Sequence, residues 1–362
     1  MSAVSRYAYL HARVSVLTQR LFQEEGLRAL IEGDASGDAL LQRIGLDRHL
    51  LVDRGSPSSD ISPPGKDTTD LEQRLVNLFL ADVETLVRPL SGEPRNLLVY
   101  WVRRYELGNL KAIIRSRMAG QTSAWIRSEL INVAPFAILP IEDLLETEDT
   151  TEMLRRLEAT PYGDIARQAR TVFEERHDLF VLDAVVDKHY YTGLIQRVQA
   201  LPTVEQRHLR PLIGILIDRI NLMWLLRYRF VYDLAPAHTY YLLVPNATQL
   251  TQLPSSQLLS LVQLDTPEEV IRNLSPALAE VIDKATTPSA VEDHLIHEIN
   301  RQAQFVLRNT LFSVARAFAY LVLREHQLHQ IHVILKGKQL RLSEELIRAA
   351  AQLSIASTVA QR

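Results

Sequence analysis

Three stretches of this chain share one pattern, in which an acid or amide is followed three residues later by Asn or Gln and then by an apolar pair and a basic residue. They read Glu106-Leu-Gly-Asn109-Leu-Lys-Ala-Ile113-Ile114-Arg115, Asp218-Arg-Ile-Asn221-Leu-Met-Trp-Leu225-Leu226-Arg227 and Gln327-Leu-His-Gln330-Ile-His-Val-Ile334-Leu335-Lys336. The offsets between the copies are 112 and 109 residues. A second marker, Leu71-Glu72, Leu182-Asp183 and Val291-Glu292, recurs at offsets of 111 and 109. Solenoid units are only about 20 to 50 residues long, so this period indicates three small helical lobes of similar design.

The spacing of the apolar residues predicts an all-α protein. Apolar residues recur at intervals of three and four, glycine is scarce at 13 of 362 residues, and no alternating run is flanked by hairpin turns. We expect a first helix over residues 5–31, a short one near 39–44, a C-terminal helix over 343–359, and short helices with Pro or Thr at their starts in the second and third lobes. The long helix pairs are predicted over 70–90 with 94–118, 179–201 with 210–233, and 290–312 with 313–336.

The breaks between these helices divide the chain. The stretch 54–69 is rich in Pro, Ser and Gly and is therefore predicted to be a loop. Natural boundaries fall near residues 125 and 238. We therefore predict an N-terminal helix with a first lobe over 1–125, a second lobe over 126–237, and a third lobe with the C-terminal helix over 238–362.

Composition excludes several classes of function. Forty basic and 43 acidic residues give a net charge of -3, which argues against a dedicated nucleic-acid surface or a polybasic membrane anchor. The absence of Cys excludes disulfides, thiolate zinc sites and cysteine nucleophiles. No signal-like stretch opens the chain, and the best candidate for a membrane helix, 212–226, carries Asp218, Arg219 and Asn221 in its middle. We expect a chain that is soluble or that reaches a membrane through its partners.

Two carboxylates of the repeated pattern fall within apolar helix faces. At 100° per residue, Glu106 lies between Leu110 and Ile113. Asp218 is placed in the same way in the second copy. Burying a carboxylate is costly unless it is paired or hydrogen-bonded, so each should meet a donor from a neighbouring helix or from its own Asn. An acid that fixes the register of a lobe explains this pattern better than general acid/base chemistry, which requires a second, tuned group and is rarely built in triplicate.

Two other clusters carry residue types that can bind metals. His326, His329 and His332 stand three apart, as do His294 and His297, but this spacing rotates around a helix and would not bring three metal ligands together. Asp183 and Asp187 could hold magnesium in an all-α enzyme, although such sites usually need a second acidic cluster facing the first. No Gly-rich phosphate loop, nucleophile elbow or zinc motif is present in the sequence. We predict no catalytic residues, no cofactor and no metal.

Taken together, several segments resemble one protein family. They are Tyr7-Ala-Tyr9-Leu-His-Ala-Arg13-Val, the segment from Tyr100 to Arg115, Leu182-Asp183-Ala-Val-Val-Asp187-Lys-His-Tyr190-Tyr191, and Ile217-Asp218-Arg-Ile-Asn221-Leu. These segments resemble the C subunit of bacterial and archaeal V/A-type ATPases, whose eukaryotic V-ATPase homologue is the d subunit. The resemblance spans residues 5 to 350 and includes the internal repeat. The third copy departs from it, because Gln327 and Gln330 stand where the family commonly has an acid and Asn.

The resemblance implies a funnel of three pseudo-symmetric helical lobes around a polar cavity, without an active site of its own. It implies a position on the cytoplasmic face of the membrane, where the protein sits on the proteolipid ring and receives the tip of the central shaft. The implied role is to couple the ATP-converting head to the ion-carrying rotor. Two other hypotheses stay open: a free helical scaffold for soluble partners, and a magnesium-dependent enzyme that uses Asp183 and Asp187. The sequence indicates neither the coupling ion, proton or sodium, nor the direction of the reaction.

Overall fold

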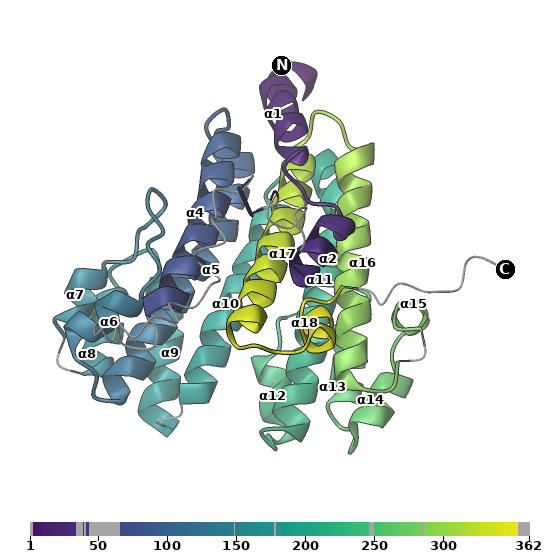
Figure 1. Ribbon diagram of the computed structural model, residues 1–362. Coiled ribbons are helices and arrows are strands. Elements are labelled where there is room, and N and C mark those ends of the chain that lie inside the picture. Colours follow the sequence, from purple (N-terminus) through teal and green to yellow (C-terminus); the bar gives the residue numbers. More distant parts are fainter. Residues whose placement is uncertain are drawn as a thin grey trace. The chain divides into compact units, whose positions relative to one another are not determined.

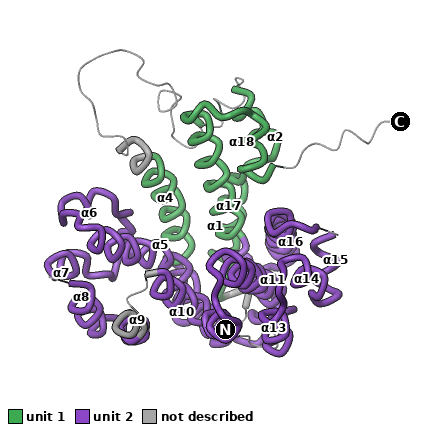
Figure 2. The backbone as a smooth tube through the Cα atoms, turned by 90° about the horizontal axis from the view of Figure 1, so that it is seen from below, with its two compact units in different colours: residues 1–88, 320–362 green, residues 89–319 purple. Residues whose placement is uncertain are grey.

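The fold is all-α, as the sequence predicts. The computed structural model describes residues 3–33, 39, 41–42, 66–147, 149–176, 179–245, 250–283 and 285–353, and within these ranges every regular element is helical (Figure 1). The chain forms two compact units (Figure 2). Unit 1 combines residues 1–88 with residues 320–362, and unit 2 comprises residues 89–319.

Unit 1 joins the two ends of the chain. It contains α1 (Ala3–Thr18), α2 (Glu24–Glu32), α4 (Lys66–Val87), most of α17 (Val314–Gln339) and α18 (Glu344–Ala350). On α1 a stripe of buried residues at helical spacing faces the core, namely Tyr7, Leu10, Val14 and Leu17. Helices from both ends of the chain, α1 and α2 with α17 and α18, therefore belong to one compact unit.

Unit 2 is built on four long helices, α5 (Gly92–Met118), α10 (Leu179–Gln199), α11 (Thr203–Phe230) and α16 (Pro288–Asn309). α5 packs on α10, and α11 packs on both α10 and α16. The short helices α6 (Ser123–Glu129), α7 (Ile141–Leu145) and α8 (Thr150–Leu157) lie with α9 (Gly163–Arg176) beside α5 and α10, as Figure 1 shows. A second set follows α11: α12 (Pro236–Leu242), α13 (Ser255–Leu261), α14 (Pro267–Arg272) and α15 (Pro276–Val281).

Several predicted helix boundaries were right. α5 and α17 end within three residues of the predicted positions, and the predicted short helices appear as α7, α8, α13 and α14. Their starts carry the expected signals: Pro140 and Pro254 are the N-cap residues of α7 and α13, and the Thr266 side chain accepts from the Glu269 N–H at the start of α14. α8 is capped by Asp149.

Three predicted helices were wrong in extent. The single helix predicted over 5–31 is divided into α1 and α2, and the turn between them is held from outside by α17, as described below. α11 begins at Thr203 rather than near residue 210, so Pro211 lies inside the helix and removes one backbone donor there. The C-terminal helix predicted over 343–359 was too long, because α18 ends at Ala350, and residues 66–69 of the predicted loop belong to α4. The rest of that loop at 54–65, most of the 39–44 helix and residues 354–359 lie outside the described residues.

Candidate functional site

The repeated pattern occupies corresponding places on three long helices. Glu106 and Asn109 lie on α5, Asp218 and Asn221 on α11, and Gln327 and Gln330 on α17. Five of these six side chains are buried, and Gln327 is half-buried. We call each pair a clamp, numbered first, second and third along the chain, because of the backbone segments that it holds.

The amide of each clamp holds the residue that follows a short helix. Asn109 donates to the Ile131 carbonyl at 2.7 Å and accepts from the Ile131 N–H at 2.9 Å, just beyond α6. Asn221 makes the same two bonds with Val244, beyond α12, at 3.2 and 2.8 Å. Gln330 donates to the Ala351 carbonyl at 2.9 Å, directly after α18. A side-chain amide suits this place because it can donate and accept at once.

The other member of each clamp binds a second segment. Glu106 accepts from the backbone N–H of Leu139, at 2.8 Å, and of Ile138. Asp218 accepts from the N–H of Gln252, at 2.7 Å, and of Leu253, at 3.1 Å. Leu139 and Leu253 immediately precede the N-cap prolines of α7 and α13, so the two carboxylates fix the same point of two similar segments.

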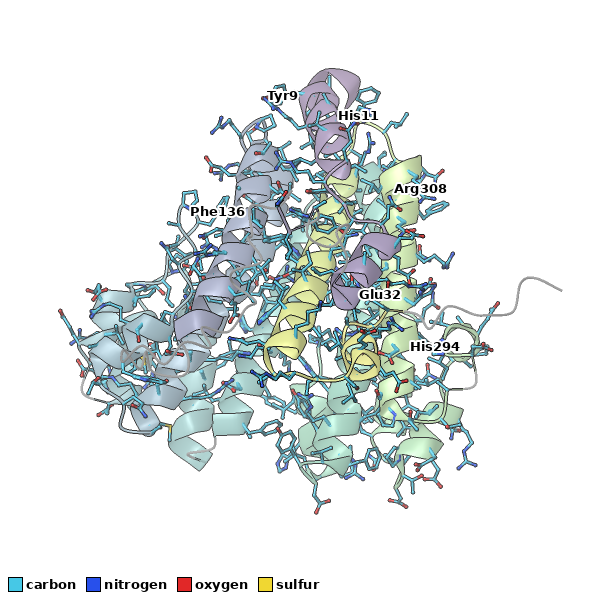
Figure 3. All side chains as sticks on the ribbon, in the orientation of Figure 1. Tyr9, His11, Glu32, Phe136, His294 and Arg308 are labelled. Atoms are coloured by element: carbon cyan, nitrogen blue, oxygen red, sulfur yellow. The ribbon has the colours of Figure 1, made fainter. Side chains whose placement is uncertain are left out.

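The third clamp makes the corresponding contact with the opposite end of the chain. Gln327 accepts from the Phe22 N–H at 2.9 Å and donates to the Phe22 carbonyl at 2.8 Å. Phe22 precedes Gln23, the N-cap residue of α2. Here α2 therefore stands where α7 and α13 stand in the first two clamps. Glu32 of α2, labelled in Figure 3, also accepts from Arg348 of α18 at 3.0 Å.

The three clamps differ in charge. Glu106 receives bonds from the guanidinium of Arg103 and, at 2.5 Å, from the hydroxyl of Tyr162. Arg103 also donates to the carbonyl of Phe136, a residue labelled in Figure 3. Burial and the neighbouring carboxylate of Glu106 raise the pKa of Tyr162, so its hydroxyl remains a donor. In the second clamp, Ile215 occupies the position of Arg103, and burial raises the pKa of Asp218 to about 7.

The second repeated marker forms ion pairs between long helices of unit 2. Asp183 of α10 pairs with Arg115 of α5, whose Nε lies 2.9 Å from the carboxylate. Glu292 of α16 pairs with Arg219 of α11. In unit 1 the negative charge of Glu72 acts on His332 of α17, although burial lowers the pKa of that histidine more strongly. Of the two other basic residues of the pattern, Arg227 is exposed and Lys336 is half-buried.

The aspartates that could hold magnesium, Asp183 and Asp187, are engaged in ion pairs. Asp183 and Asp187 each carry a basic partner, since Lys111 lies 2.6 Å from Asp187. Within the described part of the chain, no three His, Asp or Glu side chains gather where they could hold a metal ion. Among the described helices, none is both long and apolar enough to span a membrane.

Sequence reasoning missed a buried ionic cluster in unit 1. Asp82 of α4 accepts from Arg324 at 3.1 Å, from the hydroxyl of Tyr320 at 2.7 Å, and from Arg20 at 2.9 Å. A signal for it was available, because Asp82 lies on the helix face of Phe79 and Val83, which are buried. Arg103 stands three residues before Glu106, so the sequence also offered a signal for their ion pair. The segments held by the clamps had no such signal, because they contribute backbone groups.

Comparison with known proteins gives one consistent result. The family model described as ATP synthase (C/AC39) subunit matches residues 10–350. The C subunit of the A-type ATP synthase of Methanocaldococcus jannaschii is 23% identical over 352 residues, which cover 95% of this chain and 85% of that protein. The C subunit of the A-type ATP synthase of Methanococcoides burtonii is 22% identical and aligns over 95% of this chain and 93% of its own length. The C subunit of the A-type ATP synthase of Haloquadratum walsbyi is 24% identical and aligns over 94% of this chain and 96% of its own length.

Proposed function

The chain belongs to the ATP synthase (C/AC39) subunit family, and on that premise we propose that it is a non-catalytic central-stalk subunit of a V/A-type rotary ATPase. In this role it couples the rotor shaft to the proteolipid ring of the membrane sector. It lies at the cytoplasmic face of the membrane and is held there by its partners. The match to the family over residues 10–350 carries the proposal, because it covers all described long helices rather than one motif.

The clamps support a mechanical role. A part that transmits torque must not yield, and close-packed interiors transmit strain rather than absorb it. The clamps tie backbone 21 to 35 residues away, and in the third clamp also 305 residues away, to a long helix through buried or partly buried hydrogen bonds. Such bonds are costly to break, because the groups would be left without partners in the interior. We therefore assign a structural role to the clamp residues.

The hydrogen bonds also support the proposed three-lobe design. The first and second clamps hold similar segments, and the third uses α2 for the corresponding contact. We propose the lobes 1–125, 126–237 and 238–362, with α2 completing the third lobe although it lies in the first part of the chain.

Co-purification tests the function. The chain is tagged in its native host, membranes are solubilised in mild detergent, and the proteins that accompany it are identified by mass spectrometry. We expect proteolipid, shaft and head subunits in one assembly. A chain recovered alone from the soluble fraction, in cells shown to contain an assembled ATPase, would reject the coupling role.

A matched pair of variants separates assembly from catalysis. Glu106→Ala and Asp218→Ala remove the carboxylates of the first and second clamps and are expected to weaken folding or incorporation into the complex. ATP hydrolysis by the isolated head should be unchanged. A correctly folded variant that abolished hydrolysis by the head would contradict a non-catalytic role.

A further inference from the structure

The second clamp is built differently from the other two. Glu106 of the first clamp is neutralised by Arg103, and Gln327 of the third clamp cannot titrate. Asp218 is 1% exposed and has no cationic partner within the described part of the chain. Its only described hydrogen-bond partners are two backbone N–H groups. A buried carboxylate in this setting is costly in its charged form.

The segment that Asp218 holds lies very close to α11. An added Cβ at Gly214, one turn before Asp218, would stand 2.0 Å from the Leu250 carbonyl oxygen. Gly214 therefore permits the backbone of residues 250–251 to lie directly on the helix. Beyond it, Gln252 and Leu253 donate to Asp218. We call residues 250–253 the latch segment.

Charged groups on the surrounding elements do not neutralise Asp218. Arg219 of α11 pairs with Glu292 of α16, and Arg301 pairs with Glu298 within α16. On α10, Asp183 pairs with Arg115 and Asp187 pairs with Lys111. Lys188 of α10 donates to the Tyr241 carbonyl. The other titratable groups on α10, α11, α12, α14, α15 and α16 are His189, Tyr190, Tyr191, Arg197, Glu205, Arg207, His208, Arg210, Arg227, Tyr228, Arg229, His238, Tyr240, Tyr241, Glu268, Glu269, Arg272, Glu280, Asp293, His294, His297 and Arg308. None of them is among the causes that set the pKa of Asp218, which burial raises to about 7 against the opposing effect of the two N–H groups.

We propose that the second clamp is a proton-sensitive latch, closed most firmly when Asp218 is protonated and loosened as the pH rises through neutrality. When the latch segment leaves α11, Asp218 becomes hydrated and its pKa returns to the ordinary value near 4. The closed form then binds the proton more tightly than the open form, so proton binding favours closure. This property goes beyond the proposed coupling role and does not depend on it.

Hydrogen exchange of the full-length chain measures the latch directly. With a pKa of about 7 in the closed form, closure is about tenfold more favourable at pH 6 than at pH 8. After correction for the intrinsic pH dependence of exchange, the amides of Gln252 and Leu253 should therefore exchange about tenfold faster at pH 8. The amides of Ile138 and Leu139 in the first clamp provide the internal control and should show no such ratio.

Two variants make the result decisive. Asp218→Asn removes the titrating group, so the ratio at Gln252 and Leu253 should fall to about one. Arg103→Met removes the cation from the first clamp and leaves Glu106 with uncharged donors alone, the Tyr162 hydroxyl and two backbone N–H groups, so Ile138 and Leu139 should acquire a pH dependence of the same sign. The latch is rejected if wild-type Gln252 and Leu253 show the same ratio as Ile138 and Leu139, or if Asp218→Asn keeps the wild-type ratio. If Asp218→Asn does not fold, an unchanged ratio in Arg103→Met overturns the proposal.

Discussion

Replacing Asn221 by Ala isolates the energetic contribution of one clamp. Asn221 is 0% exposed, and its two bonds satisfy both polar groups of Val244, which is 1% exposed. The substitution leaves a buried N–H and a buried carbonyl without partners, and each such group costs about 1 to 3 kcal/mol. We therefore expect a local loss of about 2 to 5 kcal/mol, since part of the cost is relieved if water enters.

Local exchange is the suitable assay, because a chain with two compact units need not unfold in one step. A loss of about 2 kcal/mol corresponds to roughly 30-fold faster exchange of the Val244 amide. Asn109→Ala should produce a smaller effect of the same sign at Ile131, which is half-buried. Asn96→Ala, at an exposed position near the start of α5, should change stability by less than about 0.5 kcal/mol.

Two results of the exchange measurements would contradict the proposed role of Asn221 and Asn109. If Asn221→Ala and Asn109→Ala both leave their target amides within threefold of the wild-type rate, the clamps do not hold these segments. If only distant amides respond, the loss arises from general unfolding. Either result would refute the reasoning that the repeated amides fix the segments after α6 and α12.

Three further changes test other parts of the fold. Gly214→Ala introduces a Cβ 2.0 Å from the Leu250 carbonyl and should destabilise unit 2 by about 1 to 3 kcal/mol, measured by chemical denaturation. Asp82→Ala leaves the buried Arg324 without its carboxylate and should cost about 3 to 5 kcal/mol, whereas Glu84→Ala on the exposed face of α4 should cost little; equal losses would contradict the buried cluster. Deletion of residues 1–33 removes Phe22 from the third clamp, so limited proteolysis should cut α17 and α18 faster than α5 and α6; equal rates would show that α2 does not support the third lobe.

The pH dependence of stability provides an independent check on Asp218. Its pKa of about 7 in the folded chain lies above the ordinary value, so the folded state binds more protons between pH 4 and 7. The contribution of Asp218 to stability is present in acid and is lost as the pH rises through 7. Denaturation of Asp218→Asn should accordingly show a flatter profile between pH 5 and 8 than the wild type. A steeper or unchanged profile would contradict the assigned burial.

Local pattern predicts the helices and the buried acids, but long-range contacts decide what those acids bind. Glu106 and Asp218 could be placed in apolar stripes because helical periodicity is a property of neighbouring residues. Glu106 accepts from the Arg103 and Tyr162 side chains, but both carboxylates also accept from backbone N–H groups, at residues 138–139 and 252–253, and a backbone group carries no sequence signature. These backbone donors belong neither to a neighbouring helix nor to the Asn of the same clamp, which are the two sources that the sequence predicts. The sequence therefore shows that a donor is required without showing which one.

The N-terminal region illustrates the same limit. Residues 5–31 have continuous helical periodicity, yet the chain turns between α1 and α2, where Gln327 binds the backbone of Phe22 from 305 residues away. Gln327 stands where the family that the sequence resembles commonly has an acid. An amide can donate and accept, so it binds both polar groups of Phe22, which a carboxylate could not do.

The central claim is that this chain couples ATP turnover to ion movement. The most direct measurement compares ATP hydrolysis and ATP-driven ion transport in the same membrane vesicles, prepared from cells with and without the chain. We predict that loss of the chain abolishes transport while the head still hydrolyses ATP, and that the wild-type chain restores transport. Ion transport at the wild-type rate in vesicles that lack the chain would contradict this claim.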